Sequence, residues 1–326
     1  MMTSKLFAVL LGLAALGLGI DRAVAQPYPS NPVKVISDSS PGSAPDVILR
    51  IVGEVLTQSW GQQVIVINQP GASGSRAART AATATSDGYT LFMAVSSAFV
   101  TPKGTAPGIP IEIPGDLVPI SLIAENPLFI VAAPQIGVKS LAALIELARR
   151  KPGEISYAAS GRGRLSHLTG ELLQRRTDIK LLMVPYSSGG PAAAIGDVVS
   201  GRVHVLIEGG SALIGSMQPG YLEPVAVASD ARLAEFPDLP AAAETLPGFR
   251  AMAWMVMMAP AGTPDGIVRK VSEDLSPLLS RPDVRSRLAK IGSYARALSP
   301  EDTAKYILQE QATWGSILED VARSTP

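Results

Sequence analysis

The 326-residue sequence contains no cysteine. It therefore has no disulfide and no thiol nucleophile, and it lacks the cysteine to which a lipid anchor would be joined after export. The missing cysteine leaves the redox compartment open, because an exported protein can do without disulfides.

Histidine is also scarce. His167 and His204 are the two histidines, and their separation of 37 residues fits no short metal-binding motif. The nearest approach to a G-x-S-x-G nucleophile turn, Ala158–Arg162, lacks both flanking glycines. We therefore predict no catalytic residue, no metal and no cofactor, and a protein that is not an enzyme. A hydrolase built from a distant Ser/His/Asp set stays open as an alternative.

The sequence has no excess of charge of either sign, with 28 basic and 28 acidic residues, and aromatic residues make up 5% of it. No basic run with interleaved aromatic residues is present, so we expect no nucleic-acid partner.

Long apolar runs are missing except near the N-terminus. Lys5 precedes the uncharged apolar stretch Leu6–Ile20, which is shorter than the roughly 20 residues needed to span a bilayer. Ala23–Ala25 then gives the small-x-small pattern of a signal-peptidase site. We expect residues 1–25 to be a signal peptide cleaved before Gln26, and the chain to be periplasmic.

The remaining 301 residues show an alternation of strands and helices that predicts an α/β fold with parallel strands and right-handed crossovers. The predicted strands are Val33–Ser37, Val64–Asn68, Tyr89–Val95, Val118–Ile123, Leu128–Ala133, Ile155–Ala159, Leu181–Val184, Val203–Ile207, Pro224–Ala228 and Ala251–Ala259. The predicted helices are Asp46–Ser59, Ser75–Thr85, Leu141–Arg150, His167–Arg176, Pro191–Ser200, Pro264–Ser280, Pro282–Ile291 and Pro300–Arg323.

This length exceeds what one core usually supports, so we expect two lobes. The first comprises residues 26–124 and 249–326, and the second comprises residues 125–248. Glu125–Pro127 would be one crossover, between two separate strands. Five methionine and tryptophan residues in 252–258 predict a strand that is packed on both faces.

Ligands in open α/β sheets bind beyond the carboxyl ends of the strands, where this sequence has loops rich in small and hydroxyl residues. Ser43 followed by Asp46 resembles a capping box at a helix N-terminus, a position that suits a carboxylate. The predicted ligand-binding residues are Ser40, Gly42, Ser43, Ala44, Asp46, Ser73, Ser96, Ser97, Ser160, Gly163, Arg164, Tyr186, Ser187, Ser188 and Glu208. Loops from both lobes would thus hold one small anion.

The same loops carry a family resemblance over essentially the whole mature chain. The segments concerned are Tyr28–Lys34, Pro41-Gly42 with Asp46, Asn68–Ala72, Ser86–Leu91, Ile155–Ala158, Gly161–Gly163, Ser166–Leu168, Val184–Tyr186 and Ala259–Pro264. In this order they resemble the substrate-binding receptors of tripartite tricarboxylate transporters, the Bug-type proteins.

The resemblance implies a two-lobed, type II periplasmic-binding-protein fold that closes on a small carboxylate. It also implies transporter subunits in the membrane as partners, and we expect a monomer. A receptor that reports to a membrane signalling protein stays open as an alternative, because both roles use the same pair of lobes.

The sequence departs from the usual family pattern at Asp38, Ser43–Pro45, Arg162, Arg164, Leu165, His204 and Glu208. A planar guanidinium at Arg164 would offer a bidentate contact to a carboxylate. The alternative, that Arg162 and Arg164 are solvated charges at the rim of the cleft, stays open.

Overall fold

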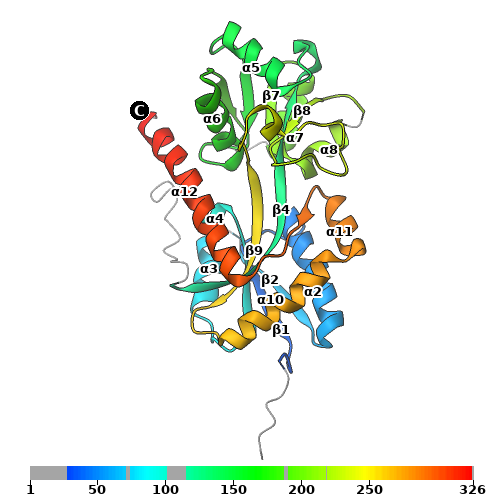
Figure 1. The fold of residues 1–326 in the computed structure, drawn as a ribbon, viewed down its shortest axis with the longest axis vertical. Coiled ribbons are helices and arrows are strands. Elements are labelled where there is room, and N and C mark those ends of the chain that lie inside the picture. The colour runs from blue at the N-terminus through cyan, green and yellow to red at the C-terminus, as the bar shows by residue number, and fades with distance from the viewer. Residues whose placement is uncertain (1–27, 71–73, 101–114, 187–189, 218, 325–326) are drawn as a thin grey trace, which may run out of the picture.

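Two lobes, each built on its own sheet, are stacked along the long axis of the molecule (Figure 1). The structure is a computed structural model and describes residues 28–70, 74–100, 115–186, 190–217 and 219–324. Its strands are β1 Val33–Ser37, β2 Val64–Asn68, β3 Thr90–Val95, β4 Leu117–Ala132, β5 Ser156–Ala159, β6 Leu182–Pro185, β7 Val205–Gly209, β8 Glu223–Val227, β9 Met252–Pro260 and β10 Tyr294–Ala295. Its α-helices are α2 Ala44–Trp60, α3 Ser75–Ala82, α4 Ser97–Val100, α5 Leu141–Arg150, α6 Leu165–Thr177, α7 Gly190–Val199, α8 Gly210–Met217, α9 Ala242–Thr245, α10 Asp265–Ser280, α11 Pro282–Ala289 and α12 Pro300–Ser324.

The sheet of the first lobe has the order β2-β1-β3-β9-β4, with β1 parallel to both β2 and β3 and β9 antiparallel to β3. Both of its faces are covered. Met255 and Met257 of β9 enter the cluster with α2 and α10, whereas Trp254, Val256 and Met258 enter the cluster with α3 and α12. This alternation follows from the two-residue period of a strand. The prediction of a methionine-rich strand packed on both faces is confirmed.

The sheet of the second lobe has the order β6-β5-β7-β4-β8. β5 is parallel to β6 and β7, so the loops that follow these three strands emerge at one edge. Apolar clusters cover both faces of this sheet as well. The α/β, two-lobed fold class predicted from the sequence is confirmed.

β4 runs without a break through the place where two strands were predicted. Residues 117–127 pair with β9, and residues 128–132 pair with β7 and β8. Pro127 does not end the strand, because it stays within the antiparallel ladder opposite Met252. The prediction of two strands was therefore wrong. Glu125–Pro127 is nevertheless where β4 passes from one sheet to the other.

α12 lies along both lobes (Figure 1). Tyr306 and Ile307 pack in the first lobe with Trp254, while Trp314, Ile317 and Leu318 pack in the cluster of the second lobe. The helix thus ties the two lobes together, and the division at residues 124/125 and 248/249 stays a prediction.

The predicted capping box at the start of α2 was wrong. Ser43 is the N-cap residue, but its side chain makes no cap hydrogen bond and its Oγ donates to the carbonyl of Ser40 at 2.7 Å. The Asp46 carboxylate accepts the N–H of Gly42 at 2.9 Å, one residue earlier than a capping box requires. The loop is therefore closed by a different pair of contacts.

Candidate functional site

A cavity of about 190 Å³ lies between the two lobes. Leu128 of β4 and Ala253 of β9 contribute from the two strands that connect the lobes. The complete lining is Val95, Ser96, Ser97, Leu128, Ser160, Gly163, Arg164, Leu165, Ser166, Glu208 and Ala253. At about 30 Å³ per water molecule, the cavity has room for about six waters or one small ligand. We call it the cleft cavity.

The first lobe supplies Ser96 and Ser97, which follow β3 directly. The Ser96 N–H donates to the carbonyl of Trp254 at 2.8 Å, and the Ser96 Oγ accepts the N–H of Trp254 at 3.3 Å. Ser96 is therefore held against β9, the strand whose Ala253 lines the same cavity. The wall on this side is fixed by backbone contacts.

A carboxylate lies behind this wall. The N–H of Val95, a lining residue, donates to Asp38 Oδ2 at 3.3 Å, and the Ser39 hydroxyl donates to Asp38 Oδ1 at 3.3 Å. No cation is paired with Asp38 among the residues that the structure describes. Burial raises the pKa of Asp38 to about 6, because the charged form loses hydration.

The second lobe supplies the loop between β5 and α6. The Ser166 Oγ accepts the N–H of Ser160 at 3.0 Å and lies 2.7 Å from the Ser160 Oγ. Gly163, with φ +72°, occupies the left-handed region that favours glycine. Its N–H donates to Nδ1 of the buried His167 at 3.0 Å. The loop is thus bound to the helix that follows it.

His167 is in turn held from the other side. With Nδ1 accepting from Gly163, the ring proton belongs on Nε2, which lies 3.5 Å from Glu171 Oε1. This contact with His167 lowers the pKa of Glu171. His204 is also internal to the fold, since its Nδ1 accepts the N–H of Ser156 at 3.0 Å. Both histidines therefore have structural contacts.

Two of the lining side chains are charged. Arg164 is the N-cap of α6 and is exposed, and no ion pair joins it to any described residue. Glu208 is the last residue but one of β7 and is half-buried, and its Oε1 accepts the N–H of Gly209 at 2.9 Å. Burial raises the pKa of Glu208. A half-buried carboxylate and an unpaired guanidinium thus line one small cavity.

The structure brings six of the predicted residues together in this lining: Ser96, Ser97, Ser160, Gly163, Arg164 and Glu208. The loop before α2 and the first turn of that helix, with Ser40, Gly42, Ser43, Ala44 and Asp46, contribute no residue to this lining. The carboxylate of the buried Asp46 already accepts hydrogen bonds from Gly42, from Arg50 at 3.0 Å and from Asn68 at 2.8 Å. Ser73, Ser187 and Ser188 lie outside the described residues.

Tyr186 also lies elsewhere. Its hydroxyl donates to Asp197 Oδ2 of α7 at 2.5 Å, which turns the side chain toward the helix. Burial and the neighbouring Asp197 raise the pKa of Tyr186 to about 12. Tyr186 is not among the residues that line the cleft cavity.

Five lining residues were not among the predicted binding residues: Val95, Leu128, Leu165, Ser166 and Ala253. Ser166 stands in a loop that the sequence singled out, and its hydroxyl was a usable signal. Leu128 and Ala253 had no such signal, because each is an apolar residue inside a strand and only the crossing of β4 and β9 exposes it to the cavity.

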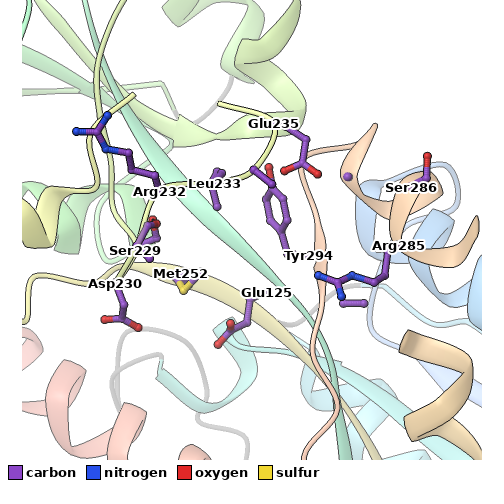
Figure 2. Close-up of a pocket in the computed structure, with 14 residues that line it drawn as sticks. Glu125, Ser229, Asp230, Arg232, Leu233, Glu235, Met252, Arg285, Ser286 and Tyr294 are labelled. Atoms are coloured by element: carbon purple, nitrogen blue, oxygen red, sulfur yellow. The ribbon is translucent and has the colours of Figure 1, made fainter. Parts of the chain in front are cut away.

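A second, larger cavity of about 450 Å³ lies at the same crossing (Figure 2). Its lining includes Glu125 and Met252, while Leu128 and Ala253 line the cleft cavity. Neighbouring residues of a strand point to opposite faces, so the two cavities lie on opposite sides of β4 and β9. We call the one in Figure 2 the rear cavity.

Among the described residues, no group of three or more His, Cys, Asp or Glu side chains is placed so that it could hold a metal ion. The helices in this part of the chain are too short or too polar to cross a membrane.

The sequence profile of the tripartite tricarboxylate transporter family receptor matches residues 48–322. The chain belongs to this receptor family. Among curated relatives, Protein BugT of Bordetella pertussis is 33% identical over 97% of each chain. The resemblance inferred from the sequence motifs is therefore confirmed, and the chain is a solute-binding receptor.

Solved structures of relatives share the fold. R. palustris Rpa4515, solved with adipate, has a TM-score of 0.75 and 28% identity, and the match covers 90% of this chain and 98% of that one. MatC of Rhodopseudomonas palustris, solved with bound malate, has a TM-score of 0.68 and 27% identity, with 89% and 100% covered. Receptors of this family are periplasmic proteins that serve a transporter.

Proposed function

We propose that this receptor captures a small carboxylate in the cleft cavity and delivers it to the membrane subunits of a tripartite tricarboxylate-type transporter. The observation that carries the proposal is Arg164, an exposed guanidinium on the cavity wall with no carboxylate partner among the described residues. The carboxylate of a bound ligand would supply the partner that Arg164 lacks.

The chemistry of the wall fits this ligand. Guanidinium binds carboxylate through two parallel, charge-assisted hydrogen bonds. Arg164 is also the N-cap of α6, a helix of 13 residues whose first backbone N–H groups and positive dipole end favour an anion. Ser96 and Ser97 of one lobe and Ser160 and Ser166 of the other supply hydroxyl groups. Contacts from both lobes to one ligand would favour their closure.

The relatives support the same ligand class. Rpa4515 was solved with adipate and MatC with malate, which are both dicarboxylates. Their folds superpose on this chain over nine-tenths of its length. The substitutions in this chain, Arg164 and Glu208 above all, indicate that its own ligand differs in detail.

Three further statements belong to the proposal. The receptor acts by binding alone, without catalysis. It is exported, with cleavage before Gln26, and the segment 1–25 lies outside the described residues. It works as a monomer, which suits a cleft formed by the two lobes of one chain.

The test is a thermal-shift screen of the mature chain, Gln26–Pro326, against small carboxylates and the matching carboxamides. A ligand at 100 times its Kd adds about 2.7 kcal/mol to the free energy of unfolding, a shift of about 5 °C or more for a chain of this size. We expect acids to shift the melting temperature and their amides to leave it unchanged. A panel in which no acid does so would contradict the proposal.

A further inference from the structure

The charges around the cleft cavity do not suit a ligand that is only an anion. Arg164 and Glu208 are the charged side chains of its lining, and neither is in an ion pair with a described residue. Both come from the second lobe, so a rotation of one lobe against the other does not bring them together by itself. The ligand therefore meets one positive and one negative group on the same lobe.

Glu208 has a vacant acceptor. Its Oε1 accepts the N–H of Gly209 at 2.9 Å, and no described cation lies within ion-pair distance of its carboxylate. A half-buried carboxylate without a cation is costly, because it loses hydration without gaining a counter-charge. A second carboxylate brought into the same cavity would add repulsion between like charges.

Asp38 adds a further carboxylate without a paired cation, on the side of the first lobe. Its carboxylate accepts the N–H of the lining residue Val95 at 3.3 Å, and no cation is paired with it among the described residues. Two acids and one guanidinium thus stand in or next to a cavity of about 190 Å³. A dicarboxylate would add two more negative charges to this set.

We propose that the ligand is a small amino acid, in which the carboxylate binds Arg164 and the protonated amine donates to Glu208. This inference rests on the proposed function, because it takes the carboxylate of the ligand to bind in the cleft cavity. An ammonium group supplies the missing counter-charge of Glu208 and up to three donors. Charge complementarity then selects against acids that lack the amine.

The first test uses pairs of ligands that differ in the amine alone: aspartate with succinate, glutamate with glutarate, and β-alanine with propionate. Each is titrated calorimetrically into the mature receptor purified from the periplasm. We expect at least one amino acid to bind ten-fold or more tighter than its deaminated partner. Equal or tighter binding of the deaminated acids would overturn this inference and leave the proposed function standing. Binding of no carboxylate of either kind would overturn both.

The second test is Glu208→Gln, which removes the charge and keeps an acceptor for Gly209. We expect the amino acid to bind ten-fold or more weaker and its deaminated partner to bind as well as before or better, so that the preference falls or reverses. Glu223→Gln, at a half-buried carboxylate of β8 outside the lining, is the matched control and keeps the preference. Equal weakening of both ligands by Glu208→Gln, with an unchanged melting temperature, would give Glu208 a structural role and contradict the proposal.

Discussion

The segment Ser160–Ser166 carries two arginines and presents one of them, Arg164, to the cleft cavity. Ser160 is bound to Ser166, and Gly163 is bound to the buried His167. Because the backbone is held in this way, Arg164 reaches the cavity wall without needing a partner of its own. Arg162, two residues earlier in the same loop, is also exposed but does not line the cavity.

This difference predicts unequal effects of two similar substitutions. Arg164→Ala should weaken carboxylate binding by about 1.5–3 kcal/mol, the scale of a hydrogen bond to a charged group, or roughly ten- to hundred-fold in Kd. Arg164→Lys should recover part of the loss, because ammonium lacks the planar fork. Arg162→Ala is the control and should bind like the wild type. Equal Kd values for Arg164→Ala and wild type in a calorimetric titration would place Arg164 at a solvated rim.

Asp38 predicts a dependence of stability on pH. Its pKa is about 6 in the folded protein and near 3.8 ordinarily, so the folded state favours the neutral acid. This contribution to stability is present below pH 3.8 and is lost as the pH rises through about 6. Asp38→Asn stays neutral, so its advantage in the free energy of unfolding should grow from pH 4 and reach on the order of 2 to 3 kcal/mol at pH 7.

Denaturant unfolding of both proteins between pH 4 and 8 measures this difference. Asp238→Asn, at an exposed position, controls for the loss of one acid from the chain. A difference between Asp38→Asn and wild type that stays constant with pH would contradict the prediction.

At this scale the sequence indicated the serines after β3 and β5, because hydroxyl residues at strand ends are a local signal. It did not separate them from the loop before α2, which has the same composition. There the decisive fact is that Asp46 is bound by Arg50 and Asn68, and Asn68 comes from the end of another strand. Contacts between segments that are distant in sequence have no local signature.

Among the connecting elements, β4, β9 and α12 share one buried ionic network. Arg250, just before β9, donates to Glu310 of α12 at 2.6 Å and is also paired with Glu125 of β4. The other Glu310 oxygen accepts the indole N–H groups of Trp254 and Trp314, each at 3.1 Å. α12 is thus fastened to both strands at the point where they leave the first lobe.

Removing Arg250 from this network should be costly. Arg250→Ala leaves Glu310 as a buried carboxylate without a counter-charge, and we expect the free energy of unfolding to fall by about 3–5 kcal/mol. Arg232→Ala, which breaks the exposed pair with Glu244, should cost far less, because water and salt screen an exposed ion pair. Urea unfolding measures both. A loss for Arg250→Ala no larger than that for Arg232→Ala would contradict this role.

The elements that the sequence predicted well are those with a strong period or clear ends. α5 Leu141–Arg150 has the predicted bounds, with Ser140 accepting the N–H of Ala143 as its cap. The four-residue helices α4 and α9 and the two-residue strand β10 were not predicted, since they have too few residues for a pattern. The helix α8 was not predicted either. The break in β4 was predicted at Glu125–Pro127, but these three residues pair with β9 and the strand continues through them.

For the whole molecule, the position of the two cavities determines how closure should act. The cleft cavity and the rear cavity lie on opposite faces of β4 and β9, so rotation about these strands that narrows one widens the other. The rear cavity separates the loop Ser229–Glu235 of the second lobe from α11 and β10 of the first (Figure 2). A bulky side chain placed there should push the lobes toward the closed form.

Ala234→Trp makes this test, because Ala234 is exposed and lines the rear cavity. Compared with the wild type, we expect a smaller radius of gyration without ligand and a Kd about two- to ten-fold lower. The reason is that a larger fraction of the receptor is already in the closed form that binds the ligand. Ala142→Trp, on the exposed face of α5, is the control. Small-angle scattering and calorimetry that show no difference between the two variants would contradict closure by rotation about β4 and β9.

The central claim is capture of a carboxylate between the lobes, and a crystal structure of the receptor with its best-binding acid tests it most directly. We predict that the carboxylate of the ligand is bound by the Arg164 guanidinium, with hydroxyl contacts from Ser96 or Ser97 in the first lobe and Ser160 or Ser166 in the second. A ligand found in the rear cavity, or one that touches a single lobe and leaves Arg164 in solvent, would contradict the account.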